Sequence, residues 1–345
     1  MNPLMTTIML FSMMMGTTLT LTSSHWLLAW MGLEINTLAI LPLMNKLNHP
    51  RSTEATMKYF LTQAAASTLI LFSTLMNAWS TGEWELKEMS SLTSNTMTIA
   101  LMMKLGLAPM HFWLPEVLQG LDLTTGLILS TWQKIAPMIL IYSIHESLNP
   151  HLLSSIGLIS ILIGGWTGLN QTQLRKIMAY SSIAHLGWMM SILPFSPMLM
   201  LLNFLLYLML TSTMFLTMKL LNTTTINSLT LSWTKTPVLT SLMAIVLLSL
   251  GGLPPTTGFI PKWLILHELT KQHTTTIATI MAISALLSLF FYLRLSYSLT
   301  LTQSPNTNNS TTMWRYKSNQ ITTPLTMMTI LSLMLIPMTP TMILI

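Results

Sequence analysis

Four ionisable side chains stand inside long apolar stretches of this chain. Glu34 lies in "HWLLAWMGLEINTLAILPL", and Lys104, Lys134 and Lys262 lie in three other such stretches. A charged lysine at the centre of a membrane-spanning helix costs about 2.5–3.5 kcal/mol. Burial favours the neutral form of an amine, so a buried lysine can exchange a proton near neutral pH, whereas arginine cannot. These residues predict proton transfer inside a membrane, with Glu34 as the counter-charge that keeps a nearby lysine protonated.

Two histidines are further candidates for the same chemistry. His111 and His185 both lie in apolar stretches, and histidine can relay protons at physiological pH. Every candidate also has a structural alternative. A lone histidine in a span is often only a packed polar group, and Glu34 can accept a purely structural hydrogen bond. The lysines can extend to the membrane surface along their aliphatic stems.

The elements that must hold these residues are membrane-spanning helices. Of the 345 residues, 51% are hydrophobic and 7% are charged, against about 25% charged in soluble domains. The backbone inside a bilayer must satisfy its own hydrogen bonds, and one helical span needs about twenty apolar residues. We expect an all-α polytopic membrane protein that forms one integral membrane domain over residues 1–345. About eleven spans are predicted, at roughly 3–22, 25–44, 58–79, 96–115, 123–144, 152–171, 176–194, 198–220, 238–268, 275–299 and 322–345.

The charges between these spans are distributed unequally. With eleven spans, ten basic residues fall on the side of the N-terminus and only two, Lys87 and Lys271, on the other. An excess of lysine and arginine marks the cytosol-like face of a membrane, so the N-terminus is predicted there and the C-terminus on the opposite face. The ten residues are Lys46, Arg51, Lys58, Arg175, Lys176, Lys219, Lys235, Arg294, Arg315 and Lys317.

A short motif occurs twice, once in the fourth span and once in the ninth. "KLGLAPMHFWLPE" and "SLGGLPPTTGFIPKW" both run Leu-Gly, then proline, then Phe and a second proline, and Glu116 stands opposite Lys262. Copies five spans apart cross the membrane in opposite directions, as in transporters whose inverted repeats contain interrupted helices. Coincidence is the alternative, because these residues are common in spans. The helix breaks are expected at Gly106, Pro109, Gly251, Gly252, Pro254 and Pro255.

Other kinds of site find no support in the sequence. Cysteine is absent, which excludes disulfides, thiolate-bound iron–sulfur clusters and a cysteine nucleophile. Neither a phosphate-binding glycine loop, a metal-spaced His/Cys cluster nor a nucleophile elbow is present. We therefore expect no redox active site, no bound metal and no cofactor in this chain, and no nucleic-acid partner.

Four segments together resemble one known family. "NHPRSTEATMKYFLTQA", "MKLGLAPMHFWLPE", "LNQTQLRKIMAYSSIAHLGWM" and "LLSLGGLPPTTGFIPKW" are similar to the subunit 2 family of the mitochondrial NADH:ubiquinone oxidoreductase, respiratory complex I, in its vertebrate form. The family belongs to the antiporter-like subunits of the membrane arm. The resemblance implies two inverted five-helix repeats, at 1–146 and 150–300, each with a broken fourth helix, and a C-terminal helix at 320–345. It also matches the family's glutamate and three lysines to Glu34, Lys104, Lys134 and Lys262, and its relay histidine less closely to His185.

The resemblance also implies a function and a location. The chain would be a proton-translocating part of the H⁺-translocating NADH:ubiquinone reductase in the mitochondrial inner membrane, with its N-terminus in the matrix and its C-terminus towards the intermembrane space. FMN, iron–sulfur clusters and ubiquinone would belong to other subunits, whose electron transfer drives the protons. The expected partners are neighbouring antiporter-like and accessory subunits and the lipid bilayer, including lipids such as cardiolipin. A stand-alone cation/proton antiporter and a structural scaffold of the membrane arm are the alternatives.

Overall fold

The computed structural model describes residues 2–46, 49–234, 236–301 and 322–334. Apart from two isolated β-bridges, His25 with Glu85 and Gln173 with Thr225, the regular structure of these residues is helical. The all-helical class is therefore confirmed for the part of the chain that is described. The chain forms two compact units, Met1–Ser160 and Ile161–Ile345.

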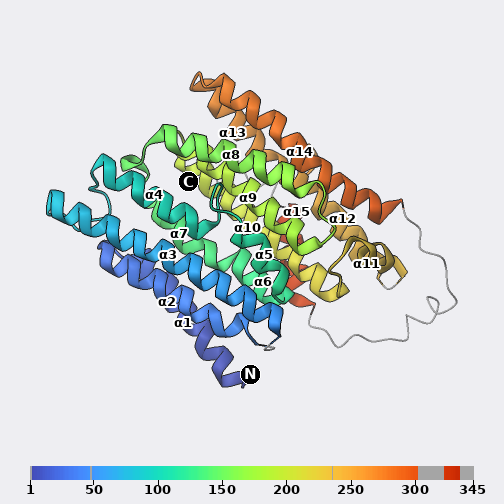
Figure 1. Cartoon of the computed structure of the whole chain (residues 1–345). Coiled ribbons are helices and arrows are strands. Elements are labelled where there is room, and N and C mark those ends of the chain that lie inside the picture. The colour runs from blue at the N-terminus through green and yellow to red at the C-terminus, as the bar shows by residue number, and fades with distance from the viewer. Residues whose placement is uncertain (1, 47–48, 235, 302–321, 335–345) are drawn as a thin grey trace. The chain divides into compact units, whose positions relative to one another are not determined.

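The first unit contains the helices from α1 to the first half of α8. Their bounds are α1 Pro3–Thr22, α2 Trp26–Met44, α3 Pro50–Thr81, α4 Ser91–Leu105, α5 Trp113–Gly120, α6 Leu123–Ser130, α7 Trp132–Ser143, the 3₁₀ turn η1 His145–Ser147, and α8 Pro150–Gly168. The helices α1, α2 and α3 lie side by side (Figure 1). A Cβ atom on Gly32 would lie 2.8 Å from the carbonyl oxygen of Gly16, so only glycine allows α1 and α2 to approach this closely.

The second unit continues from the end of α8. It contains α9 Leu174–Ile192, α10 Pro197–Leu221, α11 Ile226–Thr230, η2 Leu231–Thr234, α12 Pro237–Gly251, α13 Phe259–Lys271, α14 Thr275–Thr300 and α15 Thr323–Met334. Here α10 packs against α9, α12 and α15, and α12 also packs against α14. The small residues Gly165 of α8 and Ser284 of α14 lie where these two helices meet.

Local signals explain where the long helices begin and end. Asn2 caps α1 through its side chain, which accepts a hydrogen bond from the Leu4 amide, and Pro3 takes the first helical position, where its missing N–H costs nothing. At the other end of α3, Gly82 adopts the left-handed conformation and its amide bonds to the Ala78 carbonyl. Polar and glycine residues at the ends of apolar runs thus fix the helix boundaries.

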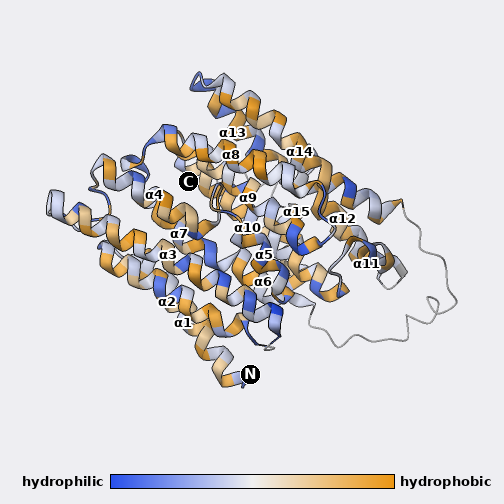
Figure 2. Cartoon of the chain, viewed as in Figure 1, coloured by the Kyte–Doolittle hydropathy of each residue, from blue (hydrophilic) through white to orange (hydrophobic). Residues whose placement is uncertain are grey.

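Six helices of the described residues are long and apolar enough to cross a membrane: α1, α2, α3, α8, α10 and α14. Figure 2 shows hydrophobic residues along the helices of both units. The shorter helices α12 and α15 are also apolar. The count of eleven spans stays a prediction. The last predicted span is described only as far as Met334, and Lys235, Arg315 and Lys317 of the charge count lie outside the described residues.

Candidate functional site

The first unit contains a helix interruption beside Lys104. Helix α4 ends at Leu105, and Gly106 follows with φ = 76°, a left-handed conformation that glycine adopts without strain. The Gly106 amide bonds to the carbonyl oxygens of Met102 and Met103 at 3.0 and 3.2 Å. Residues 107–112 are not helical, and the peptide bond between Ala108 and Pro109 is cis. Lys104 therefore lies in the last turn of a helix that stops at the interruption.

Neighbouring side chains bind the carbonyl groups that the end of α4 leaves without helical partners. The indole Nε1 of Trp113 donates to the Met103 carbonyl at 3.2 Å, and Nε2 of Gln63 in α3 donates to the Lys104 carbonyl at 3.4 Å. The last carbonyls of a helix lack intrahelical donors, so these two side chains stabilise the interrupted end. The Lys104 amine is left out of this arrangement.

Lys104 and Glu34 both carry a buried polar atom without a hydrogen-bond partner among the described residues. For Lys104, which is 6% exposed, this atom is Nζ. For Glu34 in α2 it is Oε2. The ion pairs of the described residues join Lys58 to Glu54 and Glu116 and Lys271 to Glu268, so the pair expected between Glu34 and Lys104 is not a direct contact within 4.0 Å. A buried polar atom without a partner costs about 1–3 kcal/mol, which makes these two atoms candidates for water-mediated contacts.

A cavity joins Lys104 to Lys134 inside the first unit. The volume open to the centre of a water molecule is about 20 Å³, and one buried water needs roughly 10–15 Å³ of such volume. Polar and apolar side chains share the wall, which consists of Leu33, Asn36, Thr37, Tyr59, Gln63, Lys104, Leu105, Trp113, Leu129, Gln133, Lys134 and Pro137. The two lysines that the sequence singled out in this unit therefore face one small polar cavity.

Lys134 follows a second discontinuity, which the sequence analysis did not predict. Helix α6 ends at Ser130 and α7 begins at Trp132, so Lys134 lies in the first turn of α7. The Thr131 hydroxyl donates to the Leu127 carbonyl at 2.7 Å, a contact that bends helices. Pro137 lies in the next turn of α7 and has no N–H to offer the carbonyl four residues earlier. Thr131 and Pro137 were the sequence signals for this discontinuity.

The second unit has its own interruption, beside Lys262. Helix α12 ends at Gly251, and Gly252 follows with φ = 81° and donates its amide to the carbonyls of Leu248 and Ser249 at 3.1 and 3.0 Å. Helix α13 begins at Phe259, so the prolines Pro254 and Pro255 lie between the two helices. Gly252, and not its neighbour Gly251, therefore has the backbone conformation of Gly106.

Lys262 contacts the end of the helix that precedes its interruption. Its Nζ donates to the carbonyl oxygen of Gly251 at 2.8 Å and lies 3.4 Å from that of Leu250. A Cβ atom on Gly252 would lie 3.0 Å from this Nζ and 2.9 Å from Cδ of the same lysine. The glycine thus provides both the left-handed turn and the space through which the lysine reaches the carbonyl groups.

Neither candidate histidine is among the residues that line the cavity. His111 is buried between the helices α4 and α5, with Nδ1 3.2 Å from the Pro109 carbonyl oxygen and its ring 4.3 Å from that of Phe112. It does not line the cavity. His185 belongs to α9 in the second unit, where its ring lies 5.7 Å from that of Tyr207.

Several cavity residues were missed in the sequence. Asn36, Gln63 and Gln133 are amides in otherwise apolar segments, "EINTLAI", "FLTQAAAS" and "STWQKI". Buried amides need hydrogen-bond partners, so their presence in predicted spans was a usable signal. Only ionisable side chains were considered as candidates, so the neutral amides beside them were missed.

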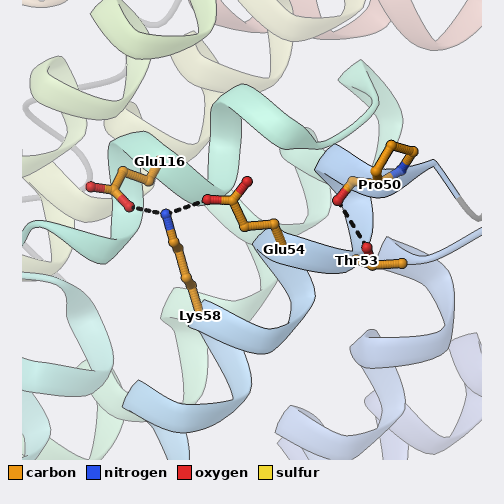
Figure 3. A network of polar contacts seen from close by, with 5 residues as sticks. All are labelled: Pro50, Thr53, Glu54, Lys58 and Glu116. Atoms are coloured by element: carbon orange, nitrogen blue, oxygen red, sulfur yellow. Dashed lines mark hydrogen bonds and ion pairs between the residues drawn. The ribbon is translucent and has the colours of Figure 1, made fainter.

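An exposed ion-pair network lies on the outer part of the first unit. Lys58 in α3 bonds to Glu54 of the same helix at 2.6 Å and to Glu116 of α5 at 2.7 Å (Figure 3). All three side chains are partly exposed, at 42% for Lys58, 63% for Glu54 and 53% for Glu116. The pair between Lys58 and Glu116 links α5, which follows the interruption, to α3.

Comparisons with known proteins agree on one family. The family model described as NADH:quinone oxidoreductase/Mrp antiporter, TM matches residues 23–288, and that described as NADH dehydrogenase subunit 2 C-terminus matches residues 289–343. The chain is 63% identical over 341 residues to NADH-ubiquinone oxidoreductase chain 2 of Xenopus laevis, covering 99% of both chains. It is 60% identical to that of Carassius auratus, covering 99% of this chain and 98% of the relative.

Solved structures share its fold at low identity. A chain of respiratory complex I from Thermus thermophilus has a TM-score of 0.84 at 23% identity, covering 97% of this chain and 78% of that one. A chain of the Mrp complex from Dietzia has a TM-score of 0.77 at 16% identity, covering 88% of this chain and 62% of that one. At these identities the likeness establishes the fold.

Proposed function

The chain belongs to the NADH-ubiquinone oxidoreductase chain 2 family within the NADH:quinone oxidoreductase/Mrp antiporter subunits, and from this premise we propose that it moves protons through buried lysines of its own. It does so as a membrane-arm subunit of the NADH:ubiquinone reductase. The observation that carries the proposal is the cavity of the first unit, which Lys104 and Lys134 both line and which has room for water. Electrons pass from NADH to ubiquinone in partner subunits, which hold the FMN, the iron–sulfur clusters and the quinone.

We also propose how the helices are arranged in the membrane. We place about eleven spans in the chain, as two inverted five-helix repeats at 1–146 and 150–300 and a C-terminal helix at 320–345. In the mitochondrial inner membrane the N-terminus faces the matrix and the C-terminus faces the intermembrane space. Two features support this proposal. One is the excess of basic residues on one side of the predicted spans. The other is the occurrence of a left-handed glycine after α4 and again after α12.

Each buried charge has a proposed role. Glu34 acts on Lys104 from α2, and the approach or withdrawal of a charge changes the proton affinity of the lysine. Two unit charges 4 Å apart interact by about 4 kcal/mol at an effective dielectric constant near 20. An approach of the two groups to that distance would therefore stabilise the charged amine, and their separation would favour its neutral form. Lys104 then passes the proton through water to Lys134, and Lys262 exchanges a proton with one side of the membrane or with a neighbouring subunit. His185 and His111 are candidates for further relay positions.

Substitution of Lys134 tests the proposal. We expect Lys134→Met in the assembled complex, reconstituted in liposomes, to lower the number of protons moved per electron. Lys134→Arg should do the same, because arginine keeps the charge but does not release a proton. The matched control is Lys87→Met, since Lys87 is an exposed lysine of the same unit. An unchanged proton-to-electron ratio in both Lys134 variants would overturn the proposal and favour a structural role in the membrane arm.

A further inference from the structure

Asn36 is a second buried group in the cavity that has an atom without a partner. Its side chain is 2% exposed and lines the cavity, and its Oδ1 has no hydrogen-bond partner among the described residues. Lys104 lines the same cavity, and its Nζ likewise has no hydrogen-bond partner among the described residues. An unpartnered donor and an unpartnered acceptor therefore share a cavity that is large enough for water.

The backbone of Asn36 is held firmly from two sides. From α7, Nε2 of Gln133 donates to the Asn36 carbonyl at 3.1 Å and lies 3.5 Å from Sδ of Met13. From α1, the close approach at Gly16 is so tight that a Cβ atom there would lie 3.1 Å from the Asn36 amide nitrogen. Gln133 is the residue before Lys134 and also lines the cavity. The Asn36 backbone, from which the carboxamide projects, is thus fixed relative to α7, which carries Lys134.

The chemistry of two facing lysines requires an acceptor between them. A charged ammonium group has three donors and no acceptor, so a molecule that joins it to a second lysine must accept a hydrogen bond from it. A water that accepts from Lys104 has two O–H groups to place. A neutral Lys134 amine can accept one through its lone pair, and a carboxamide oxygen is the natural acceptor for the other.

We propose that Asn36 is a positioning residue for proton transfer between Lys104 and Lys134, because its Oδ1 accepts a hydrogen bond from the water that joins them. The inference rests on the proposed function of the cavity. One N–H bond of Lys104 breaks as an O–H bond of the water forms, and another O–H bond of that water breaks as an N–H bond of Lys134 forms. One positive charge moves and the water is regenerated. Asn36 does not titrate, and its carboxamide oxygen, carried by a backbone that α7 and α1 hold, returns the water to the same orientation for the next transfer.

Two substitutions of Asn36 separate this role from simple packing. Asn36→Leu keeps the branched shape of the side chain but removes the acceptor, so we expect coupled proton transfer to slow by about tenfold, the effect of losing one hydrogen bond of ordinary strength. Asn36→Ala leaves space in which a second water can replace the lost oxygen, so the loss should be smaller, about twofold to threefold. A purely structural role predicts the opposite order, because alanine opens a cavity and leucine does not.

The matched control is Asn95→Leu. Asn95 lies in α4 of the same unit and its Oδ1 is also buried without a partner among the described residues, but it does not line the cavity. The readouts are the rate of proton movement coupled to NADH oxidation in liposomes and the solvent deuterium isotope effect on that rate. The isotope effect should rise in Asn36→Leu and stay unchanged in Asn95→Leu. A normal rate in Asn36→Leu, or a greater loss in Asn36→Ala than in Asn36→Leu, would overturn the inference.

The failure of this inference can be told apart from the failure of the proposed function. If Lys134→Met reduces pumping while Asn36→Leu does not, the lysines carry protons by a route that does not need Asn36. If neither variant changes pumping, the cavity has no part in proton transfer. A density map of the assembled complex that places no water within hydrogen-bond distance of both Asn36 Oδ1 and Lys104 Nζ would also contradict the role given to Asn36.

Discussion

Lys104 and Lys262 both lie beside an interrupted helix, but their amines have different surroundings. Lys262 comes from the helix after the interruption and donates to the carbonyls of Gly251 and Leu250 at the end of α12. Lys104 comes from the helix before the interruption, and its Nζ has no partner among the described residues. The comparison separates a lysine bound to a helix end from a lysine that faces a cavity.

The difference arises from which groups bind the free carbonyls. At the end of α4, Trp113 and Gln63 bind the carbonyls of Met103 and Lys104, so no lysine is needed there. At the end of α12 the lysine itself binds them. The C-terminus of a helix carries a partial negative charge that favours a nearby cation. The two amines therefore differ in their polar surroundings, because that of Lys262 contacts a helix C-terminus, whereas Lys104 lines a cavity with room for water.

The largest expected effect comes from the glycine that makes room for Lys262. Gly252→Ala forces alanine into a left-handed conformation, which costs about 1–3 kcal/mol, and places its Cβ atom 2.9 Å from Cδ and 3.0 Å from Nζ of Lys262. We expect lower heat stability of the complex and reduced proton pumping. The measurements are the midpoint of heat inactivation and the protons moved per electron.

Two other glycines provide matched controls for that variant. Gly82 has a similar φ of 78°, and a Cβ atom there would meet nothing within 4 Å, so Gly82→Ala measures backbone strain alone. Gly106→Ala would place a Cβ atom 2.9 Å from Cδ1 of Leu114 and 3.2 Å from Cζ2 of Trp113, and the three atoms nearest to it belong to these two residues and not to Lys104. Equal pumping in all three variants would show that the position of Lys262 does not depend on Gly252.

The next prediction concerns the heat stability of the complex, which should fall when Lys262 is replaced but not when Lys104 is replaced. Lys262→Met leaves the Gly251 carbonyl without its donor, which costs about 1–3 kcal/mol. Lys104→Met replaces an unpartnered buried amine by an apolar side chain of similar length, so stability should be unchanged or higher. Both variants should lose proton pumping. The heat stability of the two assembled complexes, measured side by side, checks the expectation, and equal destabilisation would remove the distinction between the two sites.

The sequence predicted the elements better than the contacts. Apolar runs located most helices within a few residues, because helix ends coincide with signals such as Pro3 and Gly82 that are visible in the sequence. The interruption between α6 and α7 was missed because residues 123–144 were taken as one apolar span. Thr131 and Pro137 disturb only the helical hydrogen bonds next to them, and this does not change the hydropathy of the segment. Hydropathy alone cannot distinguish one straight span from two short helices.

The placement of the candidate side chains required three-dimensional information. That Lys104 and Lys134 share a cavity depends on the packing of α2, α3, α4 and α7, which no spacing in the sequence encodes. The motif did not distinguish Gly251 from Gly252 as the counterpart of Gly106, and only the structure shows that Gly252 has the left-handed conformation. The roles assigned to Glu34, Lys104, Lys134 and Lys262 stay predictions. The neutral amides of the cavity were overlooked, although the sequence shows them inside predicted spans.

The smallest expected effect concerns Glu116, which stands at the motif position of Lys262. In the second unit this position is a buried lysine bound to carbonyl groups, whereas in the first it is an exposed carboxylate bound to Lys58 (Figure 3). Exposed ion pairs contribute little to stability and are screened by salt. We expect Glu116→Gln to shift the midpoint of heat inactivation by about 1 °C or less at physiological salt.

Lys58 keeps its contact with Glu54 in that variant, and proton pumping should not change. A matched Lys262→Gln variant should lose far more in both measurements. If Glu116→Gln also reduced pumping, the link between α3 and α5 would be part of the machinery of the first unit, and the two motif positions would be functionally alike despite their different surroundings.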